Sequence, residues 1–225
     1  VDVKKSVFKN NTGHYYSAGL SLAHIGSSSG ITDRVNIENC LFHDNSLSFS
    51  GAALKLDDCK GDVFNCTFAQ NSNTNSSSYY VSNLDINNST VAVKNCIFQS
   101  DDSGNEMVSG GTLSYCLING GAGGDSYTDG GNNLSSSPSF TNASGNDFTL
   151  ASNSPCIDAG SDSGAPSTDL LGITRSSTDI GCYETLKPEW TGGAGTTDWN
   201  TANNWNIGSV PGSSQDIIIP STATD

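Results

Sequence analysis

The sequence predicts an all-β solenoid, and three observations support this prediction. One phrase recurs along the chain, as VDVKKSVFKNNT at 1–12, VNIENCLFHDNS at 35–46, GDVFNCTFAQNS at 61–72, VAVKNCIFQSDD at 91–102 and, less well kept, GTLSYCLINGGA at 111–122. Within each copy apolar and polar residues alternate, and a period of two is typical of strands. No helical period is found in the copies. A single copy cannot bury its apolar side alone, so the copies are expected to stack as coils.

When the copies are aligned, one position is cysteine in every copy except the first, which has serine. The aligned residues follow one another at spacings of 34, 26, 30 and 20 residues: Ser6, Cys40, Cys66, Cys96 and Cys116. Just before this position the alternation changes phase, at Asn39, Asn65 and Asn95. Asn adopts the left-handed backbone conformation more readily than most residues other than glycine. We therefore predict a corner of the coil at each asparagine, with a short strand on either side.

The stretches between the copies supply a further strand to each coil. GLSL at 19–22, AALKL at 52–56 and NLDI at 83–86 alternate with the same period, which indicates about three short strands per coil. The unequal spacings indicate insertions in the turns, and the longest are serine-rich, HIGSSSG at 24–30 and SNTNSSSYY at 72–80. In the second insert, Tyr79 and Tyr80 either contact a glycan or pack on the coil.

The V-x-V-x-N-C-x-F copies resemble those of the right-handed parallel β-helix of the pectate-lyase-like superfamily. The resemblance covers roughly residues 1–120 and implies the same fold. The right-handed sense is expected from the resemblance and from the general rule for parallel crossover connections. Repeats of this kind indicate a fold and say little about function.

Four of the seven cysteines are expected to form a column. Cys40, Cys66, Cys96 and Cys116 share one inward position, and coils stack about 4.8 Å apart. Cysteine packs well as a small apolar residue, whereas a zinc site needs four converging ligands rather than a line. We therefore expect a buried thiol column and not a metal site. Cys59 lies outside the column, at another corner.

The segments FTLASNSPCIDAG at 148–160 and DIGCYE at 179–184 resemble the closing segment of many secreted bacterial β-helix proteins, including choice-of-anchor Q domains. The resemblance covers roughly residues 140–184. Its pattern has Ala or Cys at two positions that are both cysteine here, which implies a disulfide between Cys156 and Cys182 in an oxidising compartment. Asp158 and Asp179 of the same pattern are expected to accept hydrogen bonds from turn amides.

The composition changes after Pro188. The stretch EWTGGAGTTDWNTANNWNIGSVPGSSQDIIIP at 189–220 contains all three tryptophans. It resembles the opening of a module in multidomain secreted proteins of Bacteroidetes, commonly exported by type 9 secretion. The tryptophans either stack on sugars or, as we favour, form a small core. The predicted organisation is β-helix coils at 1–140, a closing segment at 141–187 and the beginning of an incomplete Trp-containing module at 188–225. We expect the chain to be a piece of a longer protein.

The charge of the chain limits its partners. Among 225 residues, nine are Lys or Arg and 23 are Asp or Glu, giving a net charge of −14. Such a surface repels nucleic acid and anionic lipid headgroups. No run of eighteen apolar residues is present, so no membrane insertion is expected. The expected location is secreted or on the cell surface.

Candidate catalytic residues are sparse. Enzymes of the resembled superfamily act on the outer face of a parallel sheet, where a lyase needs a base and carboxylates, and a hydrolase needs facing carboxylates. The outward positions predicted here offer Lys55, Asp57 and Asp85, which are weak candidates, and both arginines, Arg34 and Arg175, lie elsewhere.

A calcium site is a weak possibility and no other cofactor is expected. Asp57, Asp58 and Asp62 form the densest acidic group, but their spacing matches no defined calcium loop, so a solvated corner is favoured. The three histidines, His14, His24 and His43, are expected in loops or on the surface.

These observations lead to a functional expectation. We expect a non-catalytic extracellular β-helix that serves as a stalk or adhesin of a larger bacterial protein and contacts polysaccharide. The alternative is a polysaccharide lyase or glycoside hydrolase whose catalytic residues lie partly outside this chain. Capture as cargo of the secretion machinery is a third possibility.

Overall fold

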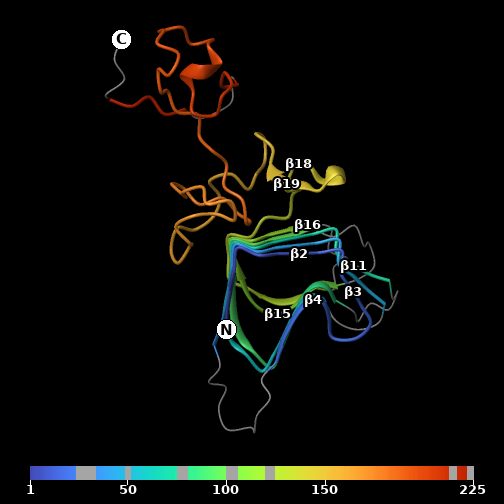
Figure 1. The fold of residues 1–225 in the computed structure, drawn as a ribbon. Helices are drawn as coiled ribbons and strands as arrows, with labels where there is room; N and C mark the ends of the chain where they lie inside the picture. The colour runs from blue at the N-terminus through green and yellow to red at the C-terminus, as the bar shows by residue number, and fades with distance from the viewer. Residues whose placement is uncertain are drawn as a thin grey trace. The chain divides into compact units, whose positions relative to one another are not determined.

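The computed structural model confirms the predicted all-β parallel solenoid. It describes residues 1–23, 34–48, 52–74, 81–99, 106–119, 125–212 and 217–221. The chain divides into two compact units, the coil unit, Val1–Glu184, and the Trp unit, Thr185–Asp225. Figure 1 shows the coil unit with its strands stacked in layers.

Three parallel sheets form the walls of the coil unit. Sheet A has the order β1 (Asp2–Lys4), β5 (Arg34–Glu38), β9 (Lys60–Phe64), β13 (Thr90–Lys94), β15 (Glu106–Ser114), β12 (Val81–Asn87), β8 (Ala52–Asp57) and β4 (Ser17–Ala23), with β17 (Ser126–Asp129) also paired to β15. Sheet B has the order β16 (Leu117–Asn119), β14 (Ile97–Gln99), β10 (Thr67–Ala69), β6 (Leu41–His43) and β2 (Val7–Lys9). Sheet C is short, with the order β11 (Ser72–Asn73), β7 (Ser46–Leu47) and β3 (Thr12–Gly13).

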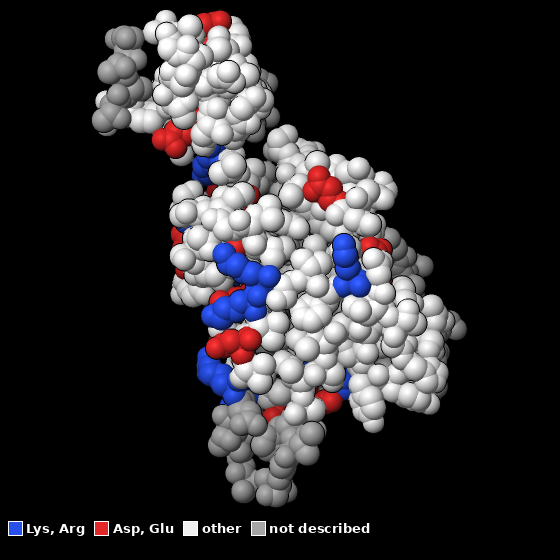
Figure 2. All heavy atoms as spheres, viewed as in Figure 1, with Lys and Arg blue, Asp and Glu red and all other residues white. Residues whose placement is uncertain are grey.

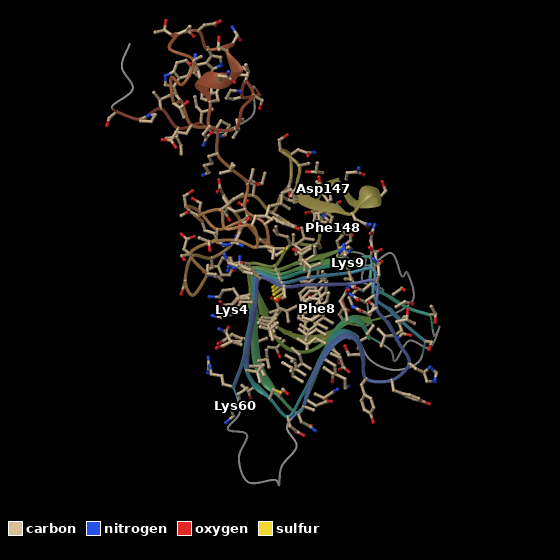
Figure 3. The ribbon with its side chains drawn as sticks, viewed as in Figure 1. Lys4, Phe8, Lys9, Lys60, Asp147 and Phe148 are labelled. Atoms are coloured by element: carbon tan, nitrogen blue, oxygen red, sulfur yellow. The ribbon has the colours of Figure 1, made fainter. Side chains whose placement is uncertain are left out.

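The register of the sheets follows the copies found in the sequence. Phe42 pairs with Phe8 on one side and with Phe68 on the other, and Phe68 pairs with Phe98. The four rings stack inside the coil with centroids 4.7, 4.8 and 5.0 Å apart (Figure 3). Equivalent side chains therefore line up along one axis, as the repeat predicts.

The first three coils each have four described strands, one more than predicted; β5, β6, β7 and β8 form one such coil. The additional strand belongs to sheet C, which a ladder of hydrogen-bonded asparagine amides supports. The Asn11 Nδ2 donates to the Asn45 Oδ1 at 2.8 Å, and the Asn45 Nδ2 donates to the Asn71 Oδ1 at 2.9 Å. Two-residue strands carry too little alternation to be seen in a sequence.

The corners predicted at asparagine have a left-handed backbone. The φ angles of Asn39, Asn65 and Asn95 are 52°, 51° and 55°. Lys5 and Tyr115 occupy the equivalent corner of the first and last copies with φ of 48° and 53°. The fold thus requires the conformation at this position, and asparagine adopts it at lower cost than most residues other than glycine.

The closing segment lies along the outward face of sheet B. The outward side chains Leu41 and Ala69 pack with Phe148 and Cys182, and Figure 3 places Phe148 over this sheet. Further along the coil, outward Ile97 and Leu117 pack with Cys156 and Ile180. Sheet B is therefore buried on both faces, which explains why its strands contain consecutive apolar residues.

Short elements complete the described chain. In the closing segment, β18 (Phe140–Asn142) and β19 (Asp147–Leu150) form an antiparallel pair joined by the 3-10 helix η1 (Ala143–Gly145). The Trp unit contains one 3-10 turn, η2 (Ala202–Asn204). Among the described residues, no helix has the length and apolar character needed to cross a membrane.

Candidate functional site

A groove of about 490 Å³ lies on the outward face of β1, β5 and β9. Alternate residues of a strand point to the same side, so three neighbouring parallel strands bring their outward side chains together here. Those that line the groove include Asp2, Arg34, Asn36, Glu38, Asp62 and Phe64. The site therefore combines carboxylates, an amide, a guanidinium and an aromatic ring.

Ion pairs hold the charged side chains of this groove in place. The Arg34 Nη2 lies 2.5 Å from the Asp62 Oδ2, and the Lys4 Nζ lies 3.0 Å from the Glu38 Oε2. The side chains of Glu38 and Asp62 keep 18% and 25% of their surface exposed, so their remaining lone pairs reach solvent. A carboxylate fixed by a cation and still accessible is well placed to accept hydrogen bonds from a ligand.

The basic residues of this acidic chain are concentrated around the groove. Five of the nine lie on this part of sheet A or at its corner: Lys4, Lys5, Arg34, Lys60 and Lys94. Figure 2 shows blue side chains gathered on this flank among a few red ones. The net charge of −14 therefore does not describe the surface that a ligand would meet here, because total charge does not show where the cations gather.

The structure brings together the three weak catalytic candidates. Lys55 on β8 pairs in register with Asp85 on β12, and its Nζ lies 2.6 Å from the Asp85 Oδ2 and 3.7 Å from the Asp57 Oδ1. The side chains of Lys55 and Asp85 are 12% and 11% exposed. One ammonium group contacts both carboxylates, so the three side chains are held by their own ion pairs and keep a formal net charge of −1.

The three aspartates proposed for calcium do not converge. Asp57 faces outward on β8, Asp58 forms the left-handed corner that follows, with φ of 51°, and Asp62 belongs to the groove, where it pairs with Arg34. Among the described residues no group of three His, Cys, Asp or Glu side chains is arranged to hold a metal ion.

The thiols of Cys40, Cys66, Cys96 and Cys116 lie in the core cluster. The Cys66 amide donates to the Cys96 Sγ at 3.4 Å, and the Cys96 amide donates to the Cys116 Sγ at 3.5 Å. Burial raises the pKa of Cys66 and Cys96 well above the usual thiol value. The thiols of Cys66 and Cys96 are therefore protonated, and the four cysteine side chains of the column act as packing groups. Cys59 is buried beside them in the same cluster.

The structure does not contain the disulfide predicted between Cys156 and Cys182. All seven cysteines are described and buried, and none forms a disulfide. The two residues belong to different clusters, Cys156 with Ile97 and Leu117 and Cys182 with Leu41 and Ala69. Burial raises the pKa of both thiols to about 12. The two cysteines therefore make separate packing contacts with the outward face of sheet B.

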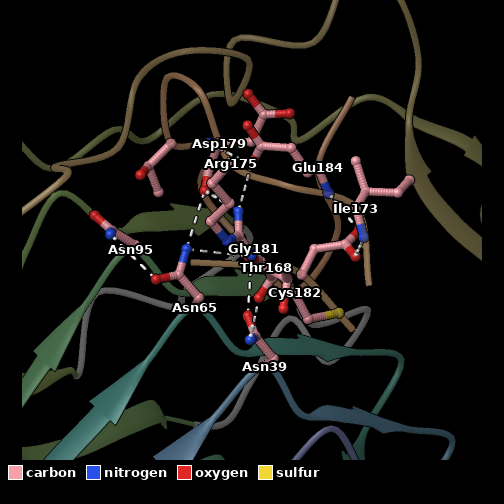
Figure 4. Close-up of polar contacts among 12 residues, drawn as sticks. Asn39, Asn65, Asn95, Thr168, Ile173, Arg175, Asp179, Gly181, Cys182 and Glu184 are labelled. Carbon is pink, nitrogen blue, oxygen red and sulfur yellow. Dashed lines mark hydrogen bonds and ion pairs between the residues drawn. The ribbon is translucent and has the colours of Figure 1, made fainter. Parts of the chain in front are cut away.

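A polar network joins the closing segment to the asparagine corners (Figure 4). The Asn39 Nδ2 donates to the Thr168 carbonyl at 2.7 Å, and the Asn95 Nδ2 donates to the Ser161 carbonyl at 2.9 Å. Between them, the Asn65 Nδ2 donates to the Asp179 carbonyl at 3.2 Å. The corner asparagines therefore bind the closing segment in addition to turning the chain.

Arg175 is the centre of this network. Its Nη1 lies 2.5 Å from the Glu184 Oε2, and its Nη2 donates to the Asn39 Oδ1 at 3.0 Å and to the Gly181 carbonyl at 3.1 Å. Both side chains of the ion pair are almost fully buried, at 3% and 4% exposure. Burial and then the Asp179 carboxylate raise the pKa of Glu184 to about 7, against the opposing effect of Arg175. This site stabilises the closing segment and is closed to ligands.

Asp179 supports the neighbouring turn in the way the sequence suggests. Its Oδ1 accepts a hydrogen bond from the Asp158 amide at 2.7 Å, and Asp158 itself has a positive φ of 53°. Both residues of the closing motif thus have structural contacts within the segment.

Several other candidates lie away from the groove or outside the description. Tyr79, Tyr80 and His24 fall outside the described residues. His14 contacts the Ser48 hydroxyl at 2.6 Å, and the buried His43 contacts the Asp44 carboxylate at 2.7 Å.

The tryptophans form the interior of the Trp unit. Trp205 is 3% exposed and its Nε1 donates to the Trp199 carbonyl at 3.0 Å. The Trp190 and Trp199 rings pack against it with centroids 5.2 and 4.6 Å away. Trp199 retains 43% exposure at the edge of this core.

Comparison with protein-family models, with curated proteins and with solved structures finds no match to the chain. The fold is that of a parallel β-helix, and the function proposed below is argued from its geometry.

Proposed function

We propose that the chain is a non-catalytic extracellular β-helix, a stalk or adhesin region of a secreted or cell-surface bacterial protein, and that it contacts polysaccharide through the groove on β1, β5 and β9. The observation that carries this proposal is the groove itself. It has paired charges, an amide and the Phe64 ring on a rigid sheet face. Export by type 9 secretion is part of the proposal and rests on the sequence resemblances described above.

The groove chemistry is suited to sugars. A pyranose ring presents an apolar face and an edge of hydroxyls, and the groove offers an aromatic ring beside carboxylate acceptors and a guanidinium donor. Phe64 is held in position by Lys94, whose Nζ lies 5.7 Å from the ring centroid. Side chains on strands keep their geometry better than side chains on loops, so little ordering is needed on binding.

The test is a glycan array with the whole chain, followed by affinity measurements on the oligosaccharides that bind. Arg34→Ala removes the exposed guanidinium, and we expect affinity to fall about tenfold, the size of one charge-assisted hydrogen bond. Asp62→Asn, which keeps the shape and removes the charge, is expected to weaken binding in the same direction.

Lys9→Ala is the matched control because Lys9 is an exposed cation on β2, outside the groove. It is expected to bind like the unaltered chain. Binding of no glycan, or equal losses in Arg34→Ala and Lys9→Ala, would contradict the proposal.

The second candidate function is a lyase or hydrolase of acidic polysaccharide, favoured by the convergence of Lys55, Asp57 and Asp85 on one sheet face. The competing explanation is an ion pair that links neighbouring coils. Incubation of the chain with uronate polymers, followed by chromatography of the products, separates the two. Product formation that disappears in Lys55→Ala supports the enzyme, and intact polymer supports the non-catalytic role.

A further inference from the structure

The turn that joins β3 to β4 presents two tyrosines to solvent. Tyr15 is 53% exposed and Tyr16 is 67% exposed. The Ser17 amide donates to the Tyr15 carbonyl at 3.0 Å, which closes a turn of three residues around Tyr16. Tyr16 has φ of 73°, the largest positive φ of any non-glycine residue described. A γ-turn of this sign is rare and strained, and a bulky side chain in it is an outlier.

Contacts on both sides hold this turn in its strained form. A Cβ on Gly13, the last residue of β3, would lie 2.6 Å from the Ser17 carbonyl oxygen, so this position requires glycine. His14 contacts the Ser48 hydroxyl at 2.6 Å, and the Ser17 hydroxyl donates to the Leu20 carbonyl at 2.8 Å. The Tyr15 ring packs edge-on against the His14 ring with centroids 4.4 Å apart, and both tyrosine side chains still remain largely exposed. Strain that persists at an exposed site points to a function.

The described strands of sheet C, which lie next to this turn, carry hydroxyl side chains and no charged residue. Thr12, Ser46 and Ser72 are aligned in register on sheet C, and none of the residues in the three described strands of this sheet is charged. An ionic ligand would find no charged partner on these strands. A neutral sugar would find aromatic faces for its C–H groups and a row of hydroxyls for its own.

We propose that the Tyr15–Tyr16 turn is a second glycan contact, specific for neutral sugar rings. The inference rests on the proposed function, because it adds a contact to a polysaccharide-binding β-helix. It lies apart from the groove: Figure 1 shows β3 on the opposite side of the coil from the N-terminus, where β1 begins. A long or branched polysaccharide is therefore held from two sides of the coil.

The variant Tyr16→Gly separates a ligand-binding role of this tyrosine from a structural role. Glycine adopts positive φ without strain, so this variant is expected to unfold at an equal or higher denaturant concentration. Its affinity for neutral hexasaccharides of β-linked glucose, mannose or xylose is expected to fall about tenfold, the upper range for one aromatic contact. Isothermal titration calorimetry on the whole chain measures the affinity.

Tyr115→Gly is the matched control, since Tyr115 is also a tyrosine at positive φ, 53°, but stands at a corner between sheets A and B. It is expected to leave binding unchanged. Unchanged affinity in Tyr16→Gly, or binding of the unaltered chain to a protein and to no neutral sugar, would overturn the inference. If Arg34→Ala loses binding and Tyr16→Gly keeps it, the groove remains the contact and the tyrosine turn does not. If the unaltered chain binds no glycan at all, both proposals fail.

Discussion

Phe42 and Phe68 lie in the middle of a stack of four rings and are fully buried, whereas Phe8 at its end is partly exposed. Each ring contacts the ring of the next coil at close to 5 Å. Parallel rings in this arrangement contribute through burial and dispersion together. The stack therefore links neighbouring coils through a single residue type.

Truncation of this stack has a position-dependent effect. We expect Phe68→Ala to lower the free energy of unfolding by about 3–5 kcal/mol, because it leaves a cavity between two other rings. Phe8→Ala, at the partly exposed end, is expected to cost clearly less. Urea unfolding of both variants measures the difference, and equal losses would show that the stack does not act as a continuous core.

Glu184 makes stability depend on pH. Its pKa in the folded chain is raised to about 7, above the value of about 4.3 for an exposed glutamate. The folded state therefore binds the proton more tightly, so this contribution to stability is fully present below about pH 4 and is lost as pH rises through 7. Relative to Glu184→Gln, the unaltered chain is expected to lose on the order of 2 kcal/mol between pH 5 and 8. Denaturant titrations at several pH values test this, and parallel pH profiles would contradict it.

At the scale of elements, β9 depends on one glycine. Gly61 has φ of 144° and pairs in register with Val35 and Val91. A Cβ at this position would overlap the Val35 carbonyl oxygen. Gly61→Ala is therefore expected to lower the free energy of unfolding by more than about 2 kcal/mol.

Gly131→Ala is the control for backbone strain alone. Gly131 also has a positive φ, 93°, but its Cβ would meet no atom within 4 Å. We expect a smaller loss in this variant. Thermal unfolding of both variants measures the two losses, and a loss in Gly131→Ala as large as that in Gly61→Ala would show that φ and not the clash decides the cost.

Arg175 determines how firmly the closing segment is attached. Removing it in Arg175→Leu leaves the buried Glu184 without its cation, which is expected to cost about 3–5 kcal/mol. The double variant Arg175→Leu with Glu184→Leu removes both charges and is expected to recover most of this loss. Hydrogen exchange should show the loss of protection first within residues 156–184. Protection that is lost equally in all coils would contradict this role.

How far the sequence predicts these elements depends on the length of each signal. The corners at Asn39 and Asn65 could be predicted because a phase change in a repeated alternation is visible over many residues. Sheet C was missed because each of its strands has two residues. The position of the closing segment was missed because Leu41 and Ile97 look like ordinary strand residues, and only a second covering layer explains their burial.

At the scale of the molecule, total charge was a poor guide to the candidate site. The sequence shows 23 acidic residues, yet Arg34, Lys60 and Lys94 lie on one flank. These residues come from different copies, 26 to 34 residues apart in the sequence. They become neighbours only because the strands of successive copies pair in register. The tyrosine turn was missed for another reason, since a positive φ at Tyr16 leaves no trace in the residue type.

The seven cysteines allow a prediction for the whole folded chain. Each is buried and none forms a disulfide, so a thiol reagent is expected to label none of them in the native state and seven after unfolding without reductant. Exposure of the core is required before any thiolate can react. Five labelled thiols after unfolding would indicate a disulfide. The intact mass before and after alkylation gives the count.

The placement of the closing segment alongside the coils has a consequence for how the molecule comes apart. Stacked repeats ordinarily fray from their ends, since each unit contacts only its neighbours. Here the segment bonds to four successive corners, through Lys5, Asn39, Asn65 and Asn95. Loss of the outermost coil therefore also disturbs the closing segment that holds the other coils. The coil unit is expected to unfold in a single cooperative step under heat or pulling force.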